Sequence, residues 1–212
     1  KTIQRLAENA KPEVTETLST GAFPKREYYP LTENQKGVYY DWEKNREALQ
    51  YNIAGTLRFS NQVDVQKLKN AAVQVVEAHP YLKTTLDIRE NEVVQLRRDA
   101  LPVEIVLNRC EEKEIESVIT SFVKPFDLFG GTLYRFEIHQ TECYTYFLFD
   151  VHHLIFDGGS MTLLLNDLKE AFEGNQLQKE EFTAFDRALE ETELAKSEKY
   201  TEAETYFDKM VG

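Results

Sequence analysis

Cysteine is scarce in this sequence, and long apolar runs are absent from it. The two cysteines, Cys110 and Cys143, are too few for a disulfide framework and stand in no metal-ligand pattern, so we expect reduced thiols and no metal site built on them. No apolar run approaches the ~20 residues that a membrane-spanning helix needs, and no signal peptide opens the sequence. We therefore expect a cytoplasmic protein without a membrane partner.

Positive charge is also in short supply. The 25 lysines and arginines are outnumbered by 37 aspartates and glutamates, which leaves a formal net charge of −12. Binding of nucleic acid through a basic face depends on cations that neutralise phosphate, so the composition argues against a nucleic-acid partner. Acidity of this kind is typical of a soluble cytosolic surface.

Apolar material is plentiful enough for a folded domain. Hydrophobic residues make up 42% of the 212 residues and aromatic residues 12%, so the chain can bury a substantial core in one large domain or two small ones. The sequence begins at Lys1 and not at a methionine, from which we expect a piece of a longer protein.

Apolar periodicity and capping residues divide the sequence into helices and strands. A short amphipathic helix is expected to end within residues 1–14, and a linker without periodicity follows over 15–27. Further helices are predicted over 32–50, 64–79, 112–123 and 161–172, with two acidic helices in 180–212, and strands over 52–59, 84–89, 93–97, 103–107, 133–140 and 144–151. The last strand is almost continuously apolar, which is typical of the middle of a sheet. The pattern indicates an α/β (α+β) fold in which helices flank a mixed sheet.

The stretch 151–160 holds the residues best suited to chemistry. His152 and His153 stand where a buried strand meets a helix, a junction at which α/β folds tend to place ligands. Side chains alternate along a strand, so one imidazole can face a cavity while the other packs behind it. Asp157 is near enough along the turn to orient a histidine or to hold the loop through an ion pair, and Gly158 leaves the backbone open to a ligand.

Imidazole is the side chain that best takes a proton near neutral pH, and such a base contributes on the order of 10²–10⁴ in rate. No serine or cysteine stands in a G-x-S-x-G context, so the expected chemistry is base-assisted attack by a substrate's own nucleophile, without a covalent enzyme intermediate. Two other interpretations stay open: a metal site on the histidine pair, for which no third ligand pattern is present, and a structural role for both histidines.

The same stretch resembles the HHxxxDG signature of the condensation domains of nonribosomal peptide synthetases, which belong to the chloramphenicol-acetyltransferase-like superfamily. Other motifs follow in the family's order. Segments similar to its "yPLSxxQ", "RHExLRT" and "FDLxxGPLxR" motifs lie at 29–35, 78–84 and 126–135. The likeness covers residues 28–212.

The resemblance implies how the chain is organised. The family's domain has two similar lobes, and this sequence ends where the second lobe would begin. We therefore expect the tail of an upstream carrier-protein helix over 1–14, a linker over 15–27, the N-terminal lobe over 28–179 and a helical connection toward the C-terminal lobe over 180–212.

The resemblance also implies an activity: an acyltransferase that forms amide bonds in antibiotic or secondary-metabolite biosynthesis. The partners would be an upstream donor and a downstream acceptor, both peptidyl or acyl carrier proteins with 4'-phosphopantetheine arms, so no cofactor is expected on this chain itself. His153 would act as base or position the amine, His152 would support the strand end, Asp157 would hold the loop through an ion pair, and Gly158 would lie near the reacting groups. Because the family's substrate tunnel lies between the lobes, this piece alone is expected to be inactive.

The sequence departs from the family pattern near 78–83. Ala78, Pro80 and Lys83 stand where the family often has Arg, Glu and Arg. If Lys83 is the partner of Asp157, a single ammonium replaces a bidentate guanidinium. Gly159 replaces a usual larger residue and could widen the entrance to the site.

Alternatives within and outside the enzyme class stay open. An epimerisation domain shares the signature but usually continues with Ser-Trp, whereas Ser160 is followed here by Met161. A heterocyclisation domain is disfavoured, because that family replaces both histidines with aspartates. The departures near 78–83 leave open a non-catalytic carrier-binding scaffold that has kept the fold.

Overall fold

The structure is a computed structural model, and it describes residues 23–197, 200, 202, 205, 206 and 209. Its strands are β1 (Tyr28–Pro30), β2 (Asn52–Ser60), β3 (Thr84–Arg89), β4 (Glu92–Arg97), β5 (Val106–Arg109), β6 (Tyr134–Gln140) and β7 (Tyr144–His152). Its helices are α2 (Glu33–Lys44), α3 (Val65–Ala78), α4 (Ile115–Phe122), α5 (Gly158–Glu173) and α6 (Ala184–Ala195), with 3₁₀ turns η1 (Pro80–Lys83) and η2 (Glu112–Glu114).

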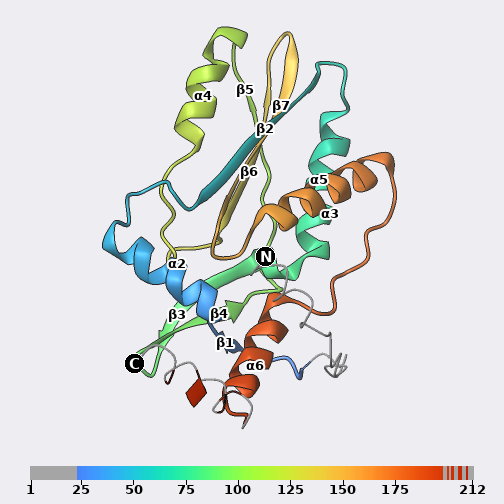
Figure 1. Cartoon of the computed structure of the whole chain (residues 1–212). Helices are drawn as coiled ribbons and strands as arrows, with labels where there is room; N and C mark the ends of the chain where they lie inside the picture. Colours follow the sequence, from blue (N-terminus) through green and yellow to red (C-terminus); the bar gives the residue numbers. More distant parts are fainter. Residues whose placement is uncertain (1–22, 198–199, 201, 203–204, 207–208, 210–212) are drawn as a thin grey trace, which may run out of the picture.

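The strands form two sheets. The smaller sheet has the order β1-β4-β3 and is antiparallel, and the larger has the order β2-β7-β6-β5 (Figure 1). In the larger sheet β7 pairs antiparallel with β2 and β6, whereas β5 pairs parallel with β6. The prediction of an α/β fold with a mixed sheet is confirmed.

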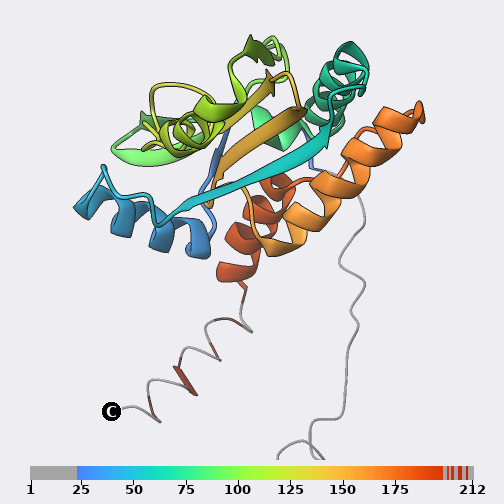
Figure 2. The ribbon, with the colours of Figure 1, turned by 90° about the horizontal axis from the view of Figure 1, so that it is seen from above.

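Strand β7 lies inside the larger sheet and buries both of its faces, as its apolar composition predicts. Phe147, Phe149 and Val151 belong to the main core, which they share with α3 and α5. Tyr146 and Leu148 point the other way and pack against α4 in a second cluster. Helices α3 and α5 lie side by side, as both views of the ribbon show (Figures 1 and 2). The sheet is therefore covered by α3 and α5 on one face and by α4 on the other.

Some predicted boundaries were wrong. The helix expected to reach residue 50 ends at Lys44, because Asn45 leaves helical geometry (φ −150°, ψ 86°) and its N–H bonds back to the Trp42 carbonyl. The strand expected over 103–107 lies at Val106–Arg109, where the ladder with β6 decides the register. The helix expected over 112–123 begins as the η2 turn before α4.

The C-terminal part of the described chain contains α6, the first of the two acidic helices expected after residue 180. Of the second expected helix, the structure describes only residues 200, 202, 205, 206 and 209, which are helical. The helix tail expected at 1–14 and most of the linker at 15–27 fall outside the described residues. Within the described part of the chain, no helix combines the length and the apolar character that a membrane crossing requires.

Candidate active site in the cleft beside His153

The loop after β7 turns the chain from the strand into α5. Ile155 closes the turn by donating its N–H to the His152 carbonyl at 3.1 Å. Asp157 then caps α5, because its Oδ1 accepts hydrogen bonds from the Ser160 N–H and the Ser160 hydroxyl, both at 2.8 Å. The sequence Asp-Gly-Gly-Ser therefore starts a helix immediately beyond the two histidines.

His152 lies behind the loop and is buried, with 1% of its surface exposed. Its Nδ1 accepts the Leu154 N–H at 3.1 Å, so in the neutral ring the hydrogen is on Nε2. Burial, assisted by nearby His153 and Arg135, lowers the pKa of His152 to about 4. His152 is thus a neutral acceptor that holds the loop near neutral pH.

His153 lies in the turn after β7 and is exposed. Its backbone N–H donates to the Tyr51 carbonyl at 2.8 Å, and its ring lies edge-on to the Tyr51 ring at a centroid distance of 6.4 Å. The His152 ring lies 5.9 Å from the same Tyr51 ring, so the two imidazoles share this neighbour and differ in their exposure. Among the described residues, no group of histidine, cysteine and carboxylate side chains could hold a metal ion.

The exposed imidazole of His153 lines a cleft with a volume of about 710 Å³. The cleft lies between the start of α2, the η1 turn, the loop at 153–157 and helices α5 and α6. Its histidine, acidic and basic lining residues are His79, His153, Asp157, Glu180, Arg187 and Glu191, and its apolar ones include Val38, Phe156, Leu163 and Leu164. Gly158 is not among the lining residues, although a Cβ atom added to it would meet no heavy atom within 4 Å, so it faces open space at the start of α5. The cleft thus offers an accessible imidazole beside mixed polar and apolar walls.

The resemblance implied that Asp157 holds the loop through an ion pair, but Asp157 forms no ion pair with any described residue, and Lys83, which we considered as its partner, lies elsewhere. Lys83 is 2% exposed, and its Nζ lies 2.6 Å from Glu77 Oε1 and donates to the Asp99 carbonyl at 3.1 Å. Asp157 is exposed, and hydrogen bonds from Ser160 lower its pKa. Asp157 therefore holds the loop as a helix cap, since the turn that carries Lys83 directs its ammonium toward α3.

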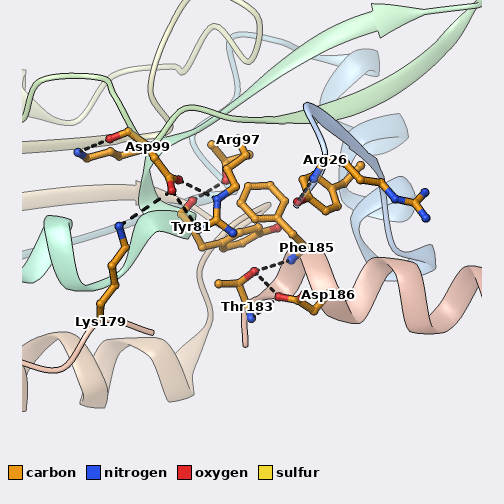
Figure 3. A network of polar contacts seen from close by, with 11 residues as sticks. Arg26, Tyr81, Arg97, Asp99, Lys179, Thr183, Phe185 and Asp186 are labelled. Carbon is orange, nitrogen blue, oxygen red and sulfur yellow. Dashed lines mark hydrogen bonds and ion pairs between the residues drawn. The ribbon is translucent and has the colours of Figure 1, made fainter. Parts of the chain in front are cut away.

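Helix α6 forms one wall of the cleft and is anchored by the side chain of Phe185, which is fully buried. The centroid of the Phe185 ring lies 4.6 Å from that of the Tyr29 ring. The centroid of the Tyr81 ring lies 4.7 Å from that of the Phe185 ring (Figure 3). The Arg97 guanidinium lies 5.7 Å from the same ring, and it forms two hydrogen bonds to Asp99, at 2.8 and 3.0 Å. The contacts of Phe185 with Tyr29, Tyr81 and Arg97 hold α6 against the smaller sheet.

Sequence reasoning missed the role of His79 in the same cleft. Its Nε2 lies 2.6 Å from Asp167 Oδ2 on α5, and its Nδ1 lies 3.4 Å from Glu180 Oε2. The hydrogen bond with Glu180, and then that with Asp167, raises the pKa of His79 although burial opposes the shift. His79 belongs to a quoted motif, but its partners lie 88 and 101 residues away, so no local pattern pointed to them.

Comparison with family models matches residues 25–212 of this chain to the Condensation domain. Surfactin synthase subunit 1 of Bacillus subtilis (strain 168) is 29% identical over 208 residues, which are 97% of this chain and 6% of that protein. The chain thus spans a small part of the length of this curated relative.

Solved structures share the fold at lower identity. The starter condensation domain of the rhizomide synthetase RzmA superposes with a TM-score of 0.74 and 14% identity, over 87% of this chain and 48% of that one. The X-domain from teicoplanin biosynthesis, solved in complex with OxyB, gives a TM-score of 0.70 and 24% identity, over 79% of this chain and 38% of that one. The likeness to these structures establishes a common fold.

Proposed function

The chain belongs to the condensation-domain family of nonribosomal peptide synthetases, and on that premise we propose that it is one lobe of a domain that joins two carrier-bound acyl groups through an amide bond. The main support for the proposal is the difference in exposure between the two histidines. His152 is buried and neutral, whereas His153 reaches an open cleft where a substrate could meet it.

The proposed reaction is acyl transfer between two thioesters. The amine nitrogen of the acceptor attacks the carbonyl carbon of the donor thioester, a C–N bond forms and the C–S bond breaks. The nitrogen loses one proton and the departing thiolate gains one, so no oxidant or reductant is required. His153 takes the proton from nitrogen or orients the amine, a role suited to imidazole near neutral pH.

The partners in this proposal are two carrier proteins, each with a 4'-phosphopantetheine arm, together with the second lobe of the same domain. The arms bring the thioesters as substrates into the cleft of about 710 Å³ beside His153. Gly158, with open space where a side chain would be, lets an acyl group approach the start of α5.

The first prediction tests His153 directly in the protein that carries both lobes. We expect His153→Ala to lower the rate of amide formation by about 10² or more, because it removes the proton-accepting imidazole. The rate is measured with loaded donor and acceptor carriers by mass spectrometry of the carrier-bound product.

The matching control is stability. The His153 ring is exposed and its N–H bond to Tyr51 comes from the backbone, so we expect an unchanged melting temperature in His153→Ala. A product yield equal to that of the natural sequence would contradict a catalytic role. If the natural protein inverts the stereochemistry of the donor and forms no amide, the epimerisation alternative is favoured instead.

A non-catalytic scaffold is the second candidate, and two observations favour it. An X-domain of this fold has been solved in complex with another protein, OxyB. In this chain Lys83, which stands where the family often has Arg, pairs with Glu77 and not with Asp157. A scaffold would bind carriers equally well before and after the His153→Ala change and would form no amide in either case.

A further inference from the structure

The backbone on both sides of His153 is held by hydrogen bonds from separate elements. The His153 N–H donates to the Tyr51 carbonyl at 2.8 Å, and the Leu154 N–H donates to His152 Nδ1 at 3.1 Å. The Leu154 carbonyl, one peptide beyond the candidate catalytic residue, accepts a hydrogen bond from Gln35 Nε2 at 2.9 Å. Gln35 on α2 therefore contacts the loop directly, although 119 residues separate it from Leu154.

The two ends of the Gln35 amide have different tasks. Its Oε1 accepts the Thr32 N–H at 2.9 Å, which completes the capping box of α2, and also accepts Gln95 Nε2 at 3.0 Å. Its Nε2 donates to Leu154 and lies 2.5 Å from the Tyr81 hydroxyl. Because two donors face Oε1, the amide cannot be flipped without placing N–H groups against N–H groups.

Neighbouring side chains hold Gln35 in this orientation. The Tyr81 hydroxyl donates to Gln95 Oε1, and Gln95 Nε2 also donates to the Pro30 carbonyl at 2.8 Å. The Tyr81 ring is fixed in turn by its edge-on contact with Phe185 (Figure 3). These side chains are buried, and in such surroundings a polar group that loses its partner is costly. The orientation of the Nε2 donor toward Leu154 is therefore imposed from several directions.

We propose that Gln35 is a positioning residue for His153, acting through the Leu154 carbonyl. The inference rests on the proposed function, because it needs His153 to take part in the reaction. Displacing a reacting group by about 1 Å can cost on the order of 10² in rate, so one buried hydrogen bond beside His153 is enough to affect catalysis. The capping task of Oε1 and the positioning task of Nε2 can be separated by substitution.

The test uses the protein with both lobes and the substitution Gln35→Glu, which keeps an oxygen at Oε1 for the α2 cap and removes the Nε2 donor. We expect kcat for amide formation to fall at least about tenfold near neutral pH, while the carrier concentrations at half-maximal rate stay unchanged. Burial raises the pKa of a carboxyl group, and the protonated carboxyl group of this variant would again have an O–H to donate. The ratio of variant to natural kcat is therefore expected to rise as the pH falls.

A second variant and a control keep the test decisive. Gln35→Met removes both the Oε1 acceptor and the Nε2 donor, and its side chain has no titratable group. The ratio of its kcat to that of the natural protein should therefore be low and independent of pH. Gln35→Met also takes the place of Gln35→Glu if the buried carboxylate prevents folding. Asp64→Ala removes the cap of α3, whose Oδ1 accepts the Lys67 N–H at 2.9 Å, outside the cleft. We expect that change to lower the melting temperature without lowering kcat.

The outcomes separate this inference from the proposed function. If the natural protein forms the amide and the folded Gln35 variants keep its kcat, Gln35 does not position His153. Gln35 also does not position His153 if kcat falls in proportion to the melting temperature in every variant, including Asp64→Ala. If the natural protein forms no amide with any loaded carriers, the proposed function fails and this inference fails with it.

Discussion

The pKa values of His152 and His79 are shifted in opposite directions because their neighbours differ. His152 faces apolar and aromatic side chains, lying edge-on to Phe126 at 5.7 Å, and its pKa is lowered to about 4 by burial. His79 faces the carboxylates of Asp167 and Glu180, which raise its pKa. At the residue scale, the partner decides whether a half-buried or buried imidazole carries a proton near neutral pH.

The second prediction concerns His79. Its pKa is raised in the folded state, so its stabilising contribution is fully present below the unfolded value near 6.5 and is lost as the pH rises through the folded pKa. We expect His79→Gln to lower the free energy of unfolding by about 1 kcal/mol at pH 6 and by less at pH 9. Urea unfolding followed by circular dichroism at both values measures this difference.

Asp167→Asn serves as the matched variant for this test. It removes one of the two carboxylates and leaves the imidazole, so the pH dependence should be reduced but not abolished. An equal loss of stability at pH 6 and pH 9 in His79→Gln would show that His79 contributes through packing and not through its charge.

At the element scale, the start of α5 depends on its cap. The third prediction is that Asp157→Ala lowers the free energy of unfolding by about 1 kcal/mol and also lowers amide formation, because the loop carrying His153 is held less firmly. Asparagine caps a helix about as well as aspartate, so Asp157→Asn should keep most of the stability. Thermal unfolding of the two variants distinguishes them. Equal losses in both would favour an ionic role for the carboxylate over capping.

The pairing of β2 with β7 requires a residue without a side chain at position 55, which is Gly55. Gly55 lies opposite Phe149, and a Cβ at Gly55 would lie 2.2 Å from the Phe149 ring, which belongs to the main core. The fourth prediction is that Gly55→Ala costs about 1–3 kcal/mol in thermal or urea unfolding, because a buried ring must move.

Gly37 supplies the control for this change. It lies within α2, and a Cβ there would meet nothing within 4 Å. Gly37→Ala should therefore stabilise the protein by about 0.4–1 kcal/mol through a better helix propensity and a less flexible unfolded chain. A stability unchanged by Gly55→Ala would mean that β2 and β7 can separate locally without cost.

At the scale of the whole molecule, the cleft is formed by elements that are distant in sequence. Its walls come from α2, η1, the loop at 153–157, α5 and α6. The solved RzmA domain is longer than this chain, which covers 48% of it. In the proposed function, the second lobe completes the channel that brings the two thioesters together.

The fifth prediction follows from that proposal. We expect residues 1–212 alone to yield no amide from loaded donor and acceptor carriers, whereas the protein with both lobes yields it under the same conditions. Mass spectrometry of the carrier-bound product measures both. Turnover by the single lobe at a comparable rate would contradict the proposed role of the second lobe.

Features that depend on near neighbours along the chain were predictable before the structure was known. The period of apolar residues marked most helices and strands, and the apolar run at 144–151 identified a strand inside the larger sheet. The sequence also predicted that one of the two histidines is buried and the other accessible. The hairpin between β3 and β4 was also predictable, and its turn residues Glu90 and Asn91 have positive φ values of 53° and 68°.

Contacts between groups that are distant in the sequence became known from the packing of the elements. The tertiary structure assigned Lys83 to Glu77, His79 to Asp167 and Glu180, and Gln35 to Leu154, and it ended the first described helix at Lys44. Side-chain hydrogen bonds and ion pairs form over a few ångströms in space, whereas sequence periodicity reports only which face of an element is apolar. Which polar groups meet across that core is set by how the elements pack.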